Sequence, residues 1–234
     1  MSLISGNLQA VKDRIATASR AVSRDPQTVA LLAVSKTFGA DAVIDAAQAG
    51  QRAFGENYLQ EALDKMAAVQ AMRPDLLLEW HIIGPIQSNK TRPIAGHFDW
   101  VHSVDREKIA QRLSEQRPPH LPPLNVCLQV NISGEESKSG ATPQQVMELA
   151  PKVAALPRLK LRGLMAIPEP AEDAEKQRAP LRQLRQLFDS LRAQGLTLDT
   201  LSMGMSADLE AAVAEGATIV RIGTAIFGKR DYAK

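Results

Sequence analysis

Short apolar segments alternate with amphipathic segments along nearly the whole chain. The apolar segments are rich in strand-forming residues, and they predict strands at 28–35, 52–55, 79–84, 98–104, 124–132, 159–167, 198–203 and 217–223. Apolar residues at helical spacing predict helices between them, at 42–49, 58–71, 106–117, 143–156, 181–193 and 207–215. Strand and helix signals therefore alternate to the end of the chain.

The first segment, from residue 3 to about residue 22, precedes this alternation. It carries apolar residues at Leu8, Val11 and Ile15, and these spacings of three and four place them on one face of a helix. Asp25-Pro26 then breaks the pattern. We expect an additional amphipathic helix before the first strand.

Eight predicted strands with helices between them favour a parallel sheet closed into a barrel, because eight is the number of units in a (β/α)8 barrel. Several of the strands are apolar on both faces, as expected when helices cover the outside. An open doubly wound sheet is the alternative, but no Gly-x-Gly-x-x-Gly follows the first strand. We expect an α/β fold, a single (β/α)8 TIM barrel with an extra N-terminal helix, in which residues 1–234 form one domain.

Lys36 ends the apolar run 29–35 of the first strand. Loss of hydration at this position disfavours the charged ammonium, so the pKa is expected to fall and the free amine to become a nucleophile. Such an amine forms Schiff bases with aldehydes, including pyridoxal phosphate (PLP). The alternative is a lysine that marks the strand end and extends into water.

Other polar residues also lie near predicted strand ends. Active sites of these barrels lie at the C-terminal ends of the strands, so such residues are expected to share one mouth with Lys36. Asn57 ends the second strand, and His81 lies in the third. His81 could bind a cofactor or could be a hydrogen-bonded core histidine.

The loops after the seventh and eighth strands combine glycine with small polar residues, which is where such barrels commonly hold a phosphate. Gly204 would allow close approach of the backbone to a ligand, and Ser206 is expected to cap a helix that begins near Ala207. A cap and a turn without a ligand are the alternative. The candidate phosphate-binding residues are Ser202, Met203, Gly204, Ser206, Gly223 and Thr224.

Arg221 is a charged residue within the eighth predicted strand, where alternation places it on one face with Ile219 and Gly223. A buried guanidinium needs a partner. One candidate is a carboxylate such as Glu56, and the other is the pyridine nitrogen of PLP. A Schiff-base lysine on the first strand, a ring partner on the eighth and a phosphate site beside them together describe a PLP site.

Composition narrows the function classes. The chain has 44% hydrophobic and 23% charged residues and a net charge of +2, so nothing indicates a nucleic-acid partner. Its one cysteine, Cys127, is expected to be a packed core thiol. We find no signal peptide, membrane span, metal-ligand spacing or nucleophile elbow, and expect a cytoplasmic protein.

Five groups of residues, in order along the chain, resemble motifs of the pyridoxal phosphate homeostasis proteins. The resemblance covers essentially the whole length. The matching segments are Leu32–Thr37, Phe54–Tyr58, Trp80–Lys90 and Arg162–Pro168, together with the C-terminal pair Leu201–Asp208 and Val220–Gly228. Phe38-Gly39-Ala40 departs from the family, which more often has a basic residue and a proline after the lysine.

The resemblance implies a fold-type III PLP barrel, related to the barrel domain of alanine racemase, in which Lys36 carries PLP as an internal aldimine. It implies a protein that binds PLP, limits its free concentration and delivers it, by transient contact, to PLP-dependent apo-enzymes. No robust catalysis is credited to the family, and we expect a monomer that binds no nucleic acid or membrane.

A PLP-dependent racemase or decarboxylase and an imine-forming aldolase are the competing functions. A two-base racemase of this type needs a second acid/base, usually a tyrosine from a further domain, and the chain has only Tyr58 and Tyr232. An aldolase would leave Arg221 without a ring nitrogen to bind. Lys138, in the polar loop 134–140, could gate release of the cofactor or could be a solvated charge.

Overall fold

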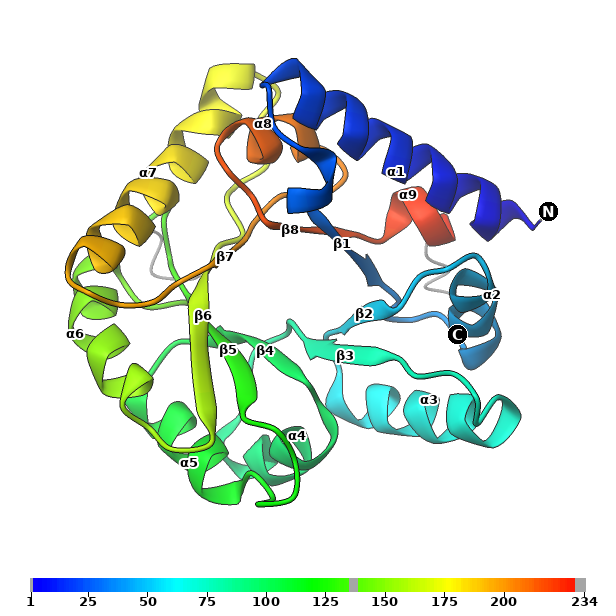
Figure 1. The fold of residues 1–234 in the computed structure, drawn as a ribbon, viewed down its shortest axis with the longest axis horizontal. Helices are drawn as coiled ribbons and strands as arrows, with labels where there is room; N and C mark the ends of the chain where they lie inside the picture. Colours follow the sequence, from blue (N-terminus) through cyan, green and yellow to red (C-terminus); the bar gives the residue numbers. More distant parts are fainter. Residues whose placement is uncertain (1, 135–138, 230–234) are drawn as a thin grey trace.

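The barrel is closed by eight parallel strands in consecutive order (Figure 1). This computed structural model describes residues 2–134 and 139–229. The first and last strands pair in parallel, from Ala30 with Ile219 to Ala33 with Ile222, which closes the ring and excludes the open sheet. The strands are β1 (Ala30–Val34), β2 (Ala53–Glu56), β3 (Glu79–Ile82), β4 (Trp100–Val104), β5 (Leu124–Gln129), β6 (Leu159–Met165), β7 (Thr200–Ser202) and β8 (Ile219–Ile222). The predicted TIM barrel is confirmed.

Helices surround this barrel on the outside (Figure 1). The helices differ from the expected pattern in places. The seventh helix begins at Ala174 rather than Leu181, because the Asp173 side chain caps it by accepting from the Lys176 amide and the helix tolerates Pro180. Short helices at Thr91–His97 and Thr224–Phe227 were not predicted. The α-helices are α1 (Leu3–Ala21), α2 (Ala40–Gln48), α3 (Leu59–Met72), α4 (Thr91–His97), α5 (Glu107–Gln116), α6 (Pro143–Ala154), α7 (Ala174–Ala193), α8 (Leu209–Ala214) and α9 (Thr224–Phe227), with 3-10 turns at Pro26–Thr28 and Ser88–Lys90.

The additional N-terminal helix is present as α1, which runs along the outside of α8 and α9 (Figure 1). Leu8, Val11 and Ile15 are buried on its inner face, as their spacing predicted. The Arg14 guanidinium reinforces this packing by donating to the Glu210 carboxylate on α8 at 2.5 Å and 2.6 Å. The helix therefore holds the two short helices that follow β7 and β8.

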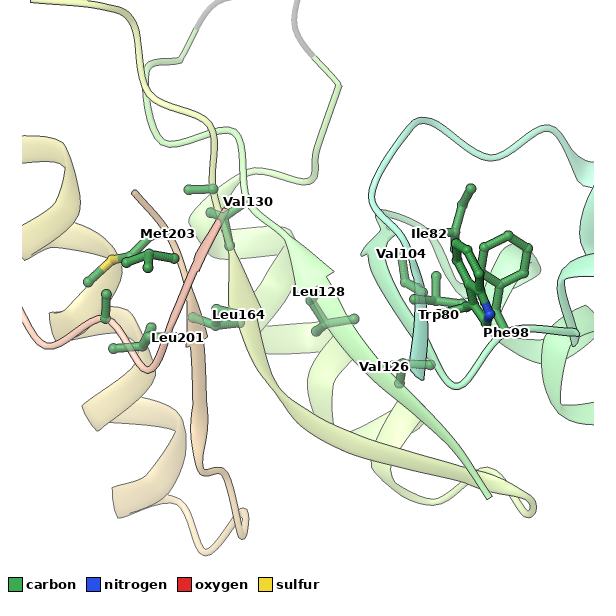
Figure 2. Close-up of a cluster of buried hydrophobic side chains, with 14 of the residues drawn as sticks. Trp80, Ile82, Phe98, Val104, Val126, Leu128, Val130, Leu164, Leu201 and Met203 are labelled. Carbon is green, nitrogen blue, oxygen red and sulfur yellow. The ribbon is translucent and has the colours of Figure 1, made fainter. Parts of the chain in front are cut away.

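Apolar side chains form an outer layer between strands and helices and a smaller cluster inside the barrel. Figure 2 shows part of the outer layer, including Trp80, Phe98 and Leu164. The inner cluster contains Leu32, Val34, Ile83, Trp100, Cys127, Met165 and Ile219. Cys127 is fully buried, and burial raises the pKa of its thiol to about 12, so the predicted core thiol is confirmed.

Gly163 in β6 is needed for the close approach of β6 to β7. A Cβ atom at this position would lie 1.7 Å from the Thr200 carbonyl oxygen, so a side chain would force the two strands apart. We expect Gly163→Ala to lower the free energy of unfolding by about 1–3 kcal/mol, measured by urea denaturation. Gly6→Ala is the control, because Gly6 lies exposed in α1 with no atom near its Cβ position, and it should raise stability by about 0.5–1 kcal/mol. Equal effects from the two substitutions would contradict this account of Gly163.

Candidate functional site

A cavity of about 270 Å³ lies at the C-terminal ends of the strands. It includes residues from the ends of β1, β2, β3, β6, β7 and β8, so the barrel brings together segments that are far apart in the sequence. Its lining is Val34, Lys36, Asn57, Ile83, Ile167, Met205, Ser206, Ala207, Arg221, Gly223 and Thr224. The predicted site residues Lys36, Asn57, Ser206, Arg221, Gly223 and Thr224 all belong to it.

Asn57 lines this cavity and carries an unsatisfied polar atom. Its side-chain oxygen Oδ1 is buried and has no hydrogen-bond partner among the described residues. The backbone of Gly84 packs directly on Asn57, since a Cβ at Gly84 would lie 2.3 Å from the Asn57 carbonyl oxygen. Burial without a partner is costly for an amide, so this position suits a ligand that supplies the missing hydrogen bond.

Arg221 lies in β8 with 4% of its surface exposed. Its Nη1 donates to the Ser202 carbonyl oxygen at 2.6 Å and to Ser202 Oγ at 2.8 Å, and its Nη2 donates to the Ala166 carbonyl oxygen at 2.8 Å. Burial lowers the pKa of the guanidinium to about 10, so it remains protonated at neutral pH. Arg221 therefore presents a positively charged donor, held by neutral oxygens, at the cavity wall.

Glu56, which we considered as a partner of Arg221, pairs with a different cation. Its Oε1 accepts from Lys65 Nζ at 2.6 Å and from Ser35 Oγ at 2.6 Å. Desolvation is the largest influence on this carboxyl and raises its pKa, despite the neighbouring ammonium. The carboxylate alternative for Arg221 is therefore wrong.

Lys65 and its second carboxylate partner, Glu61, anchor the chain on both sides of Lys36. The Lys65 ammonium donates to the Ser35 carbonyl oxygen at 2.8 Å, and Glu61 accepts from the Thr37 amide at 2.6 Å. Lys65 also contacts Glu61 at 3.0 Å, one helical turn away. Sequence reasoning missed this group. The available signal was a lysine on the apolar face of α3, in line with buried Ala62 and Val69.

The loops after β7 and β8 supply hydroxyls and close backbone packing to the cavity. Ser206 does not cap a helix at Ala207, because α8 begins at Leu209 and the Asp208 side chain accepts from the Met205 amide at 2.7 Å. The Ser206 carbonyl oxygen instead accepts from Arg14 at 2.8 Å. Its hydroxyl-bearing side chain lines the cavity together with Thr224.

His81 does not line this cavity. It lines a second cavity of about 290 Å³ at the opposite end of the barrel, which is bounded by the first residues of β1, β2, β3, β4, β7 and β8. Its ring is buried, stacks on Trp100 and approaches Glu79 and His102 at 2.8 Å each. The His81 ring lies inside the barrel, away from the cavity at the C-terminal ends of the strands. The alternative of a hydrogen-bonded core histidine therefore describes it.

Ser202, Met203 and Gly204 also lie outside the cavity lining. Ser202 is buried beneath Arg221. Met203 faces outward and lies with Leu201 in the outer apolar layer (Figure 2). Gly204 has φ +97°, and a Cβ there would lie 2.4 Å from Ala212 Cβ, so this glycine serves the packing of α8 on the barrel.

The remaining sequence features concern metal ligands, membrane spans and the residues Tyr58, Lys138 and Tyr232. Within residues 2–134 and 139–229 there is no group of three or more His, Cys, Asp or Glu that could hold a metal ion. No helix in this part of the chain is long and apolar enough to cross a membrane. Tyr58 is exposed. Lys138 and Tyr232 lie outside the described residues.

Comparison with known proteins identifies the family of this chain. The family described as alanine racemase, N-terminal domain, matches residues 6–231. A pyridoxal phosphate homeostasis protein of Pseudomonas aeruginosa is 65% identical over 232 residues, which cover 99% of this chain and 98% of that protein. The chain belongs to the pyridoxal phosphate homeostasis protein family.

Two solved structures extend the comparison of this family member. The structure of PipY from Synechococcus elongatus PCC7942, with PLP bound, is 38% identical with a TM-score of 0.82, and the match covers 96% of this chain and 100% of that one. An alanine racemase of Clostridium difficile 630 is 14% identical with a TM-score of 0.74, covering 98% of this chain and 58% of that one. This second likeness shows a shared barrel fold alone.

Proposed function

We propose that this protein binds PLP through Lys36 and takes part in intracellular PLP and vitamin B6 homeostasis and cofactor delivery. The observation that carries the proposal is one cavity in which Lys36, two residues after β1, and protonated Arg221 of β8 lie together with Ser206 and Thr224. The bound PLP of PipY and the name of the P. aeruginosa relative support it.

The donor set fits the parts of PLP. Lys36 supplies the amine that would hold the aldehyde as a Schiff base, and Arg221 supplies a donor for the pyridine nitrogen. Ser206 and Thr224 supply hydroxyls for the phosphate, beside the close backbone packing at Gly223. Asn57 supplies an amide whose buried oxygen lacks a partner among the described residues. When bound, PLP provides an electrophilic aldehyde carbon and an electron-withdrawing ring.

A holding role fits the cavity better than catalysis. In the described lining the groups other than Lys36 are apolar, hydroxyl, amide or guanidinium groups, and a two-base racemase needs a second group that can take up a proton. Arg221 keeps its proton at neutral pH. Racemase or decarboxylase activity is therefore the weaker alternative, since the likeness to alanine racemase concerns the barrel fold alone.

The proposal also covers the domain, the oligomeric state, the location in the cell and the partners of this protein. Residues 1–234 act as one PLP-binding domain, which works as a monomer in the cytoplasm. Its partners are PLP and, transiently, the apo-enzymes that need it. The absence of a basic stripe in the sequence and the small net charge of +2 argue against nucleic acid as a further partner.

Borohydride reduction in the presence of PLP tests this function. Reduction converts a Schiff base into a stable secondary amine, so peptide mapping by mass spectrometry should find the pyridoxyl group on Lys36. A parallel sample reduced without added PLP reports cofactor carried through purification. No modification in either sample, or modification spread over exposed lysines alone, would contradict the proposal.

A further inference from the structure

Five polar side chains form a continuous chain of contacts through the barrel interior, from the PLP cavity to the opposite end. Arg221 Nη1 lies 2.8 Å from Ser202 Oγ, which lies 2.7 Å from His102 Nδ1. His102 Nε2 lies 2.8 Å from His81 Nδ1, and His81 Nε2 lies 2.8 Å from Glu79 Oε1. The chain thus joins β8, β7, β4 and β3.

The middle of this chain is shielded from water. Ser202 and His102 have no exposed surface and His81 has 2%, whereas the side chain of Glu79 is 49% exposed. Trp100 stacks on His81 with ring centroids 5.3 Å apart and planes within 4° of parallel. In these surroundings an unsatisfied ring nitrogen would be costly, so every contact should be a true hydrogen bond.

The two ends require the same direction of donation. Arg221 can only donate, so Ser202 Oγ accepts from it and has its own hydrogen left for His102 Nδ1. A neutral His102 then carries its proton on Nε2 and donates to His81 Nδ1, and His81 donates from Nε2. A carboxylate can only accept, so Glu79 accepts from His81, and donation runs in one direction from Arg221 to Glu79.

Both imidazoles are neutral in this arrangement, and their surroundings favour that state. Burial lowers the pKa of His81 and lowers that of His102 well below its ordinary value. The positive charge of neighbouring Arg221 further opposes protonation of His102. At the open end, the hydrogen bond from His81 lowers the pKa of Glu79, which keeps the acceptor ionised.

We propose that Glu79, His81, His102 and Ser202 are positioning residues that orient Arg221 for PLP through one directional hydrogen-bond chain across the barrel. The inference rests on the proposed function, because Arg221 acts on PLP. Among the described residues, the atoms that accept from Arg221 are all neutral oxygens, and Asp208 acts on its charge without contact. Through Ser202, His102 and His81, the hydrogen-bond chain connects Arg221 to the carboxylate of Glu79.

The proton arrangement can be tested without PLP. In protein labelled with ¹⁵N-histidine, NMR at neutral pH should show His81 and His102 as neutral rings protonated on Nε2, assigned by His81→Gln and His102→Gln. The exposed His97 and His120 provide internal reference signals. A ring protonated on Nδ1, or a charged ring, at either buried position would overturn the chain.

The effect on PLP is tested with the exposed end of the chain, where a substitution should leave the fold intact. Glu79→Ala removes the acceptor, and Glu79→Gln restores an acceptor oxygen. We expect the PLP dissociation constant to rise about 3- to 10-fold in Glu79→Ala and to stay near that of the parent in Glu79→Gln. Ser202→Ala should raise it about tenfold.

Ser114→Ala is the matched control for Ser202→Ala, because Ser114 is likewise a buried serine with a hydrogen-bonded hydroxyl, which donates to the Pro157 carbonyl oxygen and not to the chain. It should leave PLP affinity unchanged. If the parent binds PLP through Lys36 but Glu79→Ala and Ser202→Ala bind it equally well, the positioning role is overturned and the proposed function stands. If the parent does not bind PLP, the proposed function fails, and the NMR result still decides the hydrogen-bond chain.

Discussion

Lys36→Ala is expected to abolish covalent capture of PLP, and this is the largest effect that we predict. The substitution removes the amine that forms the Schiff base, while Arg221, Ser206 and Thr224 remain to bind the ring and phosphate without a covalent bond. The variant should lose the yellow absorbance of the imine and should incorporate no pyridoxyl group on borohydride reduction. Absorption spectra of the parent and variant, titrated with PLP, measure the loss.

Lys160→Ala is the control for this experiment. Lys160 is an exposed lysine in β6, outside the lining of the cavity, so its loss should leave the spectrum unchanged. If Lys36→Ala keeps the absorbance of the parent, a different lysine holds the cofactor and the assignment of Lys36 is wrong. A Lys36→Ala variant that remains folded by circular dichroism excludes loss of structure as the cause.

Lys65→Met is expected to cause the largest loss of stability, about 3–5 kcal/mol in the free energy of unfolding. The substitution leaves the Glu56 carboxylate buried without its cation, and it removes the donor to the Ser35 carbonyl oxygen. Because Glu61 holds the Thr37 amide beside the same ammonium, the segment that carries Lys36 should also loosen. Urea denaturation at neutral pH measures the effect.

The control for Lys65→Met is Lys152→Met, which removes an exposed ion pair of 3.0 Å with Glu107 and should change stability by less than about 0.5 kcal/mol. Combining Lys65→Met with Glu56→Gln should recover part of the loss, because an amide costs less to bury than an unpaired carboxylate. If the double variant is as unstable as the sum of the single ones, the ion pair does not account for the effect.

The loss in Lys65→Met should depend on pH in a defined direction. Burial already raises the pKa of Glu56 above its ordinary value of 4.5, and removal of the Lys65 charge raises it further. A carboxyl whose pKa is raised by folding favours the folded state below the unfolded value and loses that contribution as the pH rises through the folded value. The deficit relative to the parent should therefore shrink as the pH falls from about 8 to about 5.

Local patterns of apolar and polar residues were sufficient to predict most of the strands and helices. The alternation of strand and helix signals predicted the closed barrel, and the spacing of Leu8, Val11 and Ile15 predicted the buried face of α1. The predicted start of α7 at residue 181 was wrong for a local reason as well. A helix prediction that begins after Pro180 misses the Asp173 cap, which starts the helix earlier. These features depend on neighbours within a few residues.

Local sequence patterns did not predict the partners of charged and polar side chains. Lys65 of α3 and Glu56 of β2 meet because the helix packs back onto its own strand, and Arg221 and Ser202 meet because β7 and β8 are neighbours. Alternation along a strand predicts which face a residue shares, but it does not predict its depth in the barrel. His81 was therefore grouped with the mouth, although it lies toward the other end.

The sequence by itself determined the barrel, the position of Lys36 at the end of the first strand and the strand face that Arg221 shares with Ile219 and Gly223, because each follows from periodicity and strand order. Only the tertiary structure decided which polar residues share the PLP cavity, which ion pair anchors Lys36 and how Arg221 connects to Glu79. Those outcomes depend on strand register and on close packing between distant segments, where a shift of one residue turns a side chain to the other face.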